Sequence, residues 1–108
     1  MSLIKEIEIM LPGINPKLVT LMNVVDADFK GIVEEAIGIF GDVETLFNSK
    51  DYKKASLRTI NLGTKLIDLE NVSKGKEWSE LLEDCLKDVN TLEKYMRDLG
   101  HIKKEALE

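Results

Sequence analysis

The residue of this sequence best suited to acid–base chemistry is its single histidine, His101. An imidazole titrates near neutral pH, so it can exchange protons under physiological conditions. Asp98 lies three residues earlier, where a helix would let its carboxylate orient the ring, and Arg97 is also near. No serine or second cysteine is arranged with them as a nucleophile, and Cys85 lies about four helical turns away. The pattern favours a histidine near a helix end over a catalytic centre.

The four residues His101 to Lys104 read His-Ile-Lys-Lys. They resemble the His-x-x-Lys motif of histidine phosphotransfer domains, which are also helical bundles. The resemblance implies a phosphorelay role for His101, with Lys104 and Asp98 beside it. The family has a glycine after the lysine, where this chain has Glu105. A His101-dependent role is therefore the alternative hypothesis, and it predicts an exposed His101 on an ordered helix.

The sequence lacks the residues that a metal or cofactor site would need. Bundle metal sites use inward-facing glutamates and paired Glu-x-x-His motifs, and this chain has no Glu-x-x-His. Glu80, Asp84 and Asp88 form a line of like charges at four-residue spacing, which favours a solvated face. The sequence also contains no phosphate-binding loop, no dinucleotide fingerprint and no zinc-ligand set. We expect no metal, no cofactor and no enzymatic activity, and we interpret Cys85 as a small core residue.

Basic residues gather near the start of the third predicted helix. Lys50, Lys54 and Arg58 are four residues apart, Lys53 lies beside them, and Lys65 follows about two turns later. The ordinary interpretation is a solvated face. Alternatives are weak phosphate or nucleic-acid binding, or an acidic partner such as the first half of another subunit, which carries all the excess negative charge. The net charge of −5 and a pI near 5.0 make nucleic acid the less favoured partner.

Helical periodicity runs through most of the chain and predicts the elements that position these groups. The clearest repeat alternates steps of four and three, which is the spacing of a bundle helix starting near position 77 and running to about 106. Its members are Trp78, Leu82, Cys85, Val89, Leu92, Met96 and Leu99.

Two further helices follow the same rule. The second has its apolar row at Phe29, Val33, Ala36, Phe40, Val43 and Phe47. The third runs from about 51 to 72, with a row at Tyr52, Ala55, Leu62, Leu66 and Leu69 that Ile60 and Ile67 widen. The link between them is only about three residues long, so the two helices must be antiparallel neighbours. Asn48 or Ser49 is the expected cap of the third helix, and Asp26 or Asp28 that of the second.

The N-terminal region is less regular. Leu11-Pro12-Gly13 is expected to stop a short first helix, and Asn15-Pro16 to start another of about two and a half turns. With 44% hydrophobic residues and no credible strand, the fold class is all-α. We predict one domain over residues 1–108: an antiparallel bundle of about four helices with left-handed heptad packing and a short N-terminal helical segment. No run is long enough to span a membrane, so a cytoplasmic location is the default.

The second helix also suggests a contact surface. Gly31 and Gly38 are seven residues apart on the face opposite its apolar row, which indicates either a poorly optimised surface or close approach of another helix. That helix would be the N-terminal segment or one from a second subunit. Ile39 and Leu46 flank the row, and Leu57 lies off the apolar row of the third helix. Apolar stripes this wide indicate either a central helix or a partner chain. The sequence therefore predicts a non-enzymatic interaction or regulatory module, most simply a homodimer, that uses Gly31, Gly38, Ile39 and Leu46.

Overall fold

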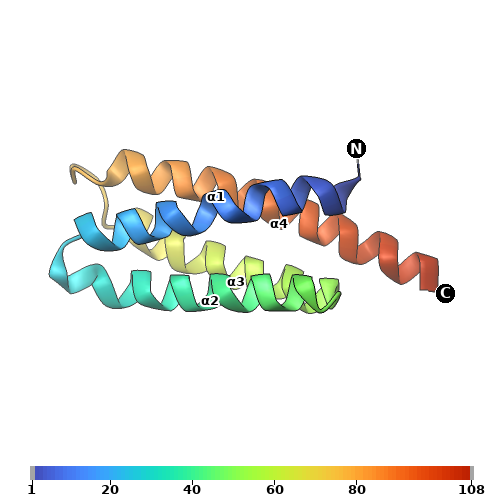
Figure 1. The fold of residues 1–108 in the computed structure, drawn as a ribbon. Coiled ribbons are helices and arrows are strands. Elements are labelled where there is room, and N and C mark those ends of the chain that lie inside the picture. The colour runs from blue at the N-terminus through green and yellow to red at the C-terminus, as the bar shows by residue number, and fades with distance from the viewer. Residues whose placement is uncertain (1, 108) are drawn as a thin grey trace.

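The computed structural model describes residues 2–107, and it confirms an all-α bundle (Figure 1). Four α-helices and one short 3₁₀ turn, η1, account for nearly all of the described chain. In order they are α1 (Leu3–Val24), η1 (Ala27–Phe29), α2 (Lys30–Asn48), α3 (Tyr52–Glu70) and α4 (Ser79–Leu107).

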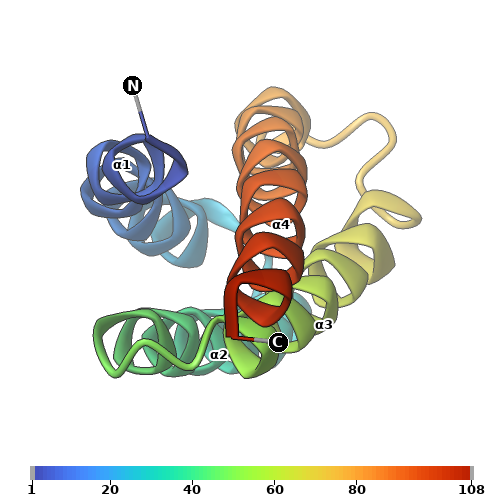
Figure 2. The same cartoon turned by 90° about the vertical axis from the view of Figure 1, so that its right-hand side faces the viewer.

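The helices surround a common core in chain order. Each helix packs against the next one, and α4 returns to pack against α1, so that every helix has two neighbours (Figure 2). All four neighbouring pairs are antiparallel (Figure 1). The bundle measures 48 × 23 × 20 Å. The left-handed sense of packing stays a prediction. The predicted apolar row of α4 is buried along its whole length, from Trp78 to Leu99.

The structure corrects the expected break in the N-terminal region. Pro12 and Pro16 both lie inside α1, which runs without interruption for 22 residues. Both prolines and Gly13 face solvent, where water can satisfy the carbonyl groups that proline leaves unpaired. On the opposite side, five apolar residues spaced by four and three are buried, so tertiary packing outweighs the local signals. They are Ile7, Leu11, Ile14, Leu18 and Leu21.

The expected cap of α3 was also misplaced. The N-cap is Asp51, whose side chain accepts a hydrogen bond from the Lys54 backbone N–H at 3.4 Å. Lys50 precedes it in the left-handed region, with φ 64°, and its N–H donates to the Phe47 carbonyl oxygen. The chain therefore reverses within the three residues between α2 and α3.

At the opposite end, contacts join the loop before α4 to the start of α2. The Lys76 ammonium group forms an ion pair with the Asp26 carboxylate at 2.7 Å. The Asp26 side chain makes no capping hydrogen bond, so it is not the helix cap that the sequence predicts. Trp78 packs edge-on against Phe29, with ring centroids 5.9 Å apart. These contacts fix both ends of the bundle and leave its long helix faces as the candidate surfaces.

Candidate interaction surface

The outward side of α3 carries a second row of side chains, separate from the row that enters the core. We call it the outer row; its members alternate steps of four and three residues, and all are exposed. They are Lys53, Leu57, Ile60, Thr64, Ile67 and Asn71. Its three apolar members remain 44 to 56% exposed, whereas Leu62, Leu66 and Leu69 on the other side of α3 are fully buried. The helix is therefore apolar on two opposite sides, and the bundle uses only one of them.

The sequence predicts only part of the outer row. Leu57 lies off the core row, as its spacing indicates, whereas Ile60 and Ile67, which are expected to widen the core row, lie outside it beside Leu57. The signal was present, because residues three and seven apart share a helix face.

A shallow groove lies beside the outer row, between α3 and α4. It has a volume of about 280 Å³, and Ile60, Gly63, Ile67 and Val89 provide its apolar lining. Gly63 leaves this space open: a Cβ there would lie 3.8 Å from Val89 Cγ1. The apolar surface of α3 thus continues towards α4.

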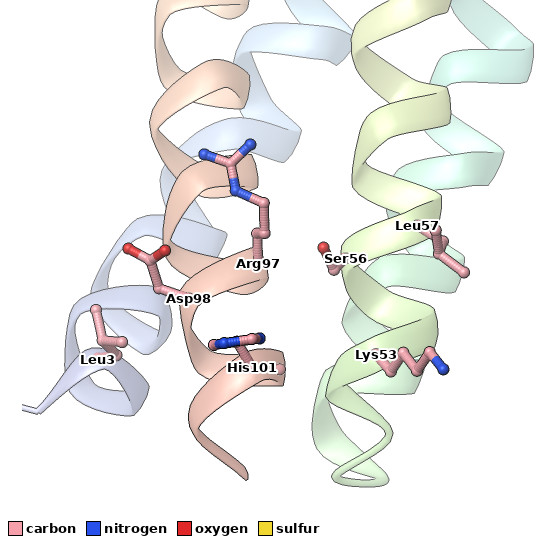
Figure 3. Close-up of a pocket in the computed structure, with 8 residues that line it drawn as sticks. Leu3, Lys53, Ser56, Leu57, Arg97, Asp98 and His101 are labelled. Atoms are coloured by element: carbon pink, nitrogen blue, oxygen red, sulfur yellow. The ribbon is translucent and has the colours of Figure 1, made fainter. Parts of the chain in front are cut away.

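A larger open depression lies where the start of α3 meets the end of α4 (Figure 3). Its volume is about 640 Å³. Arg97, Asp98 and His101 extend from α4, and Ser56 lies between the two helices. Arg97 forms an ion pair with Glu93 at 3.3 Å. The remaining lining residues are Leu3, Lys53, Leu57 and Gly100. The depression combines apolar walls with both cationic side chains and the Asp98 carboxylate. The side chain of Lys104, which the resemblance placed beside His101, lies outside the described side chains.

The basic residues that the sequence groups on α3 have different neighbours in the structure. Arg58 pairs with Asp42 at 2.9 Å and Lys65 with Glu35, both across the α2–α3 contact. The Glu35 carboxylate raises the pKa of Lys65 by hydrogen bonding to it. Lys54 lies 3.8 Å from Asp51 at the helix start. Lys50 occupies the turn, and Lys53 belongs to the outer row. The acidic partner of Arg58 and Lys65 is therefore α2 of the same chain.

The acidic line on α4 also has a cationic neighbour. The Lys17 ammonium group of α1 lies 2.7 Å from Asp88 and 3.6 Å from Asp84. The hydrogen bond to Asp88 is the main cause that raises the pKa of Lys17. One cation therefore offsets the repulsion between the Asp84 and Asp88 carboxylates, and these ion pairs join α1 to α4.

Within the described part of the chain, no cluster of histidine, cysteine and carboxylate side chains is arranged to hold a metal ion.

Among the described residues, no other helix contacts the glycine face of α2. Gly31 and Gly38 are exposed, and a Cβ added at either would meet nothing within 4 Å. The expected approach of the N-terminal segment is therefore wrong, while the approach of a second subunit stays a prediction. Ile39 is only 8% exposed and Leu46 is half-buried, so little of this predicted surface is apolar and free.

Cys85 lies in the core, as its place in the α4 repeat indicated. Its side chain is fully buried, and this burial raises the pKa of the thiol to about 11. A thiol that stays protonated is a poor nucleophile.

None of the described helices is both long and apolar enough to cross a bilayer.

Comparisons with known proteins add no relative. No protein-family model matches the chain, and neither the curated proteins nor the solved structures include a significant match.

Proposed function

We propose that this protein is a non-enzymatic interaction module that recognises another protein through the outer row of α3. The observation that supports the proposal is the row itself: Leu57, Ile60 and Ile67 share one helix face, and they stay exposed in the part of the chain that the structure describes. Burying apolar surface is favourable by roughly 25 cal/mol per Å². A regular apolar row bounded by polar side chains is the pattern by which helix faces bind partner helices.

Other exposed apolar residues do not form a comparable surface. Ile9, Val19 and Val24 lie on α1, where prolines and a glycine also face solvent, and Val72 lies in the turn after α3. Isolated apolar residues of this kind are normal on protein surfaces. The outer row of α3 differs because its members repeat at the spacing that a helical partner requires.

Site-specific photo-crosslinking tests the proposal. A benzophenone amino acid is placed at Ile60, and a matched variant carries it at Glu34, an exposed position of α2. After irradiation in the cells that produce the protein, adducts are identified by mass spectrometry. We expect a defined protein adduct from position 60 and none from position 34. Absence of an adduct at position 60, or equal adducts at both positions, would contradict the proposal.

A His101-dependent role is the second candidate. It is favoured by the position of His101, which is exposed on α4 and lines the larger depression with Arg97 and Lys53. Acetyl phosphate would transfer its phosphoryl group to an imidazole nitrogen and release acetate. Incubation of the wild type and of His101→Ala with acetyl phosphate, followed by mass spectrometry at neutral pH, tests this role. Acid-labile phosphorylation that requires His101 would support it, and an unlabelled wild type would remove it.

A further inference from the structure

The exposed side of α3 has the features of a helix that pairs with a copy of itself. Figure 2 shows α3 flanked by α2 and α4, and no described helix lies on its side away from the bundle axis. The outer row alternates steps of four and three residues over the whole helix, from Lys53 to Asn71. This is the spacing that lets side chains of one helix fit between those of another.

Charges beside the outer row change sign along the helix. Lys54 lies on the α2 side of the row near the start of α3, and Asp68 lies on the same side near its end, fourteen residues later. The Lys54 side chain is 73% exposed, and its ion pair with Asp51 is long, at 3.8 Å. Asp68 is exposed, and its negative charge contributes to the raised pKa of the neighbouring Lys65. Both side chains therefore keep exposed surface that a partner can contact.

These two charges favour one direction of pairing. When two identical helices pair antiparallel about a two-fold axis, the same side of each helix meets its counterpart with the ends reversed. Lys54 of one copy then lies beside Asp68 of the other, and the contact occurs twice. A parallel pair would instead bring the two Lys53 side chains together, which is unfavourable.

We propose that a second copy of this chain packs on the outer row of α3 in antiparallel orientation. One register brings the apolar positions of the two copies together. Leu57 then faces Ile67 of the second copy, and Ile60 lies beside Thr64, so that both pairs are centred on position 62. The Lys53 ammonium group reaches Asn71 of the other copy, and the two Lys54–Asp68 ion pairs lie along the α2 side of the contact. On the α4 side the central residue is Gly63, whose missing side chain lets the two helices approach.

The size of the surface sets the strength of the dimer. A helix of 19 residues is about 28 Å long, and one helix pair of that length forms a small interface. Three apolar side chains per copy therefore give a reversible dimer, with a dissociation constant of roughly 1–100 μM. This inference rests on the proposed function, because it names the partner of the same surface.

Charge exchange tests the orientation. Lys54→Glu and Asp68→Lys each place two like-charged contacts in an antiparallel homodimer. We expect each variant alone to dimerise at least about fivefold more weakly than the wild type in sedimentation equilibrium. A mixture of the two variants restores both attractive contacts, so a heterodimer of near wild-type affinity is expected by native mass spectrometry. Lys87→Glu, on the exposed side of α4, is the matched control and should leave dimerisation unchanged.

Disulfide trapping tests the register directly. Ile60→Cys and Thr64→Cys chains of different mass are mixed and oxidised; the native Cys85 is buried and does not react. Antiparallel pairing about position 62 predicts the mixed 60–64 disulfide as the main product. Predominant 60–60 and 64–64 products would overturn the orientation.

The outcomes separate the inference from the proposed function. A wild-type chain that remains monomeric at 200 μM (about twice the upper end of the expected range) overturns self-pairing, whereas a cross-link from position 60 to a different protein still supports an interaction role. A dimer that Ile60→Ser weakens at least about tenfold supports the use of α3. If that dimer shows no recovery in the charge-exchange mixture, the antiparallel orientation is wrong. A dimer unaffected by Ile60→Ser overturns self-pairing through α3, whereas the cross-link from position 60 decides the proposed function separately.

Discussion

Gly100 of α4 lies against the first turn of α3, close to Tyr52. A Cβ at position 100 would be 3.6 Å from the Tyr52 carbonyl oxygen and 3.7 Å from the Lys53 Cα. These are ordinary contact distances, so one methyl group fits there but a longer side chain meets backbone. The absence of a side chain at Gly100 therefore sets how closely the end of α4 approaches α3. By its residue type alone, Gly100 has low helix propensity near the end of the last predicted helix.

Enlarging residue 100 should separate the two helices. We expect Gly100→Ala to be neutral or to raise the free energy of unfolding by up to about 1 kcal/mol, because alanine favours the helix. Gly100→Leu should lower it by about 1–3 kcal/mol, because the larger side chain forces α3 to move. Urea denaturation followed by circular dichroism measures both changes. A Gly100→Leu variant as stable as the wild type would show that the two helices are not in contact there.

The glycine face of α2 provides the matched comparison. Gly38 is exposed and has no neighbour within 4 Å, so Gly38→Leu should raise the free energy of unfolding by a few tenths to about 1 kcal/mol. We also expect it to leave dimerisation unchanged, because the outer row of α3 forms the proposed contact. Light scattering coupled to size exclusion checks the second point. Loss of the dimer in Gly38→Leu would indicate that the dimer forms through the glycine face of α2 and not through the outer row of α3.

Pro12 interrupts the hydrogen bonding of α1 at a solvent-exposed position. It cannot donate to the Glu8 carbonyl group, so Pro12→Ala should add one helical hydrogen bond and remove a steric conflict. We expect the free energy of unfolding to rise by about 1–3 kcal/mol. Denaturation by urea gives the value. Val19→Ala, another exposed change on α1, should stay within about 0.5 kcal/mol. A destabilised Pro12→Ala variant would indicate that the proline has a packing role.

The continuous α1 shows where sequence reasoning failed and why. Proline and glycine are local signals, and they correctly mark positions where helix formation is costly. Burial of Ile7, Leu11 and Ile14 on one side is a tertiary effect, and it compensates for that cost only after α2 and α4 are in place. The α4 repeat had no such conflict, and its burial followed directly from residue spacing.

The candidate surface was only partly predictable for a related reason. Spacing shows that Ile60 and Ile67 share a helix face, but it does not show which face enters the core. That choice depends on the positions of α2 and α4, which the local pattern of α3 does not contain. The ion pairs of Arg58 with Asp42 and of Lys65 with Glu35 likewise require the register between two helices.

Lys50 adopts a backbone conformation that favours glycine. Its φ of 64° places it in the left-handed region, where a Cβ costs roughly 1 kcal/mol. Lys50→Gly should therefore raise the free energy of unfolding by about 0.5–1 kcal/mol. Lys53→Gly, inside α3, should lower it by a similar amount and serves as the control. Thermal denaturation of both variants measures the changes, and a destabilised Lys50→Gly would contradict the turn geometry.

Cys85 should make the stability of the fold depend on alkaline pH. Burial is the main cause that raises its pKa from an ordinary value of 9.0 to about 11, so the folded state favours the protonated thiol. The neighbouring charges are Lys17, which lowers the pKa, and Asp88 and Asp84, which raise it. The stabilising contribution is complete below pH 9 and is lost as the pH rises towards 11. The free energy of unfolding should fall over this window by about 2 kcal/mol more in the wild type than in Cys85→Ala. Urea denaturation between pH 8 and pH 11 measures the two slopes, and parallel slopes would show that the thiol is not buried as described.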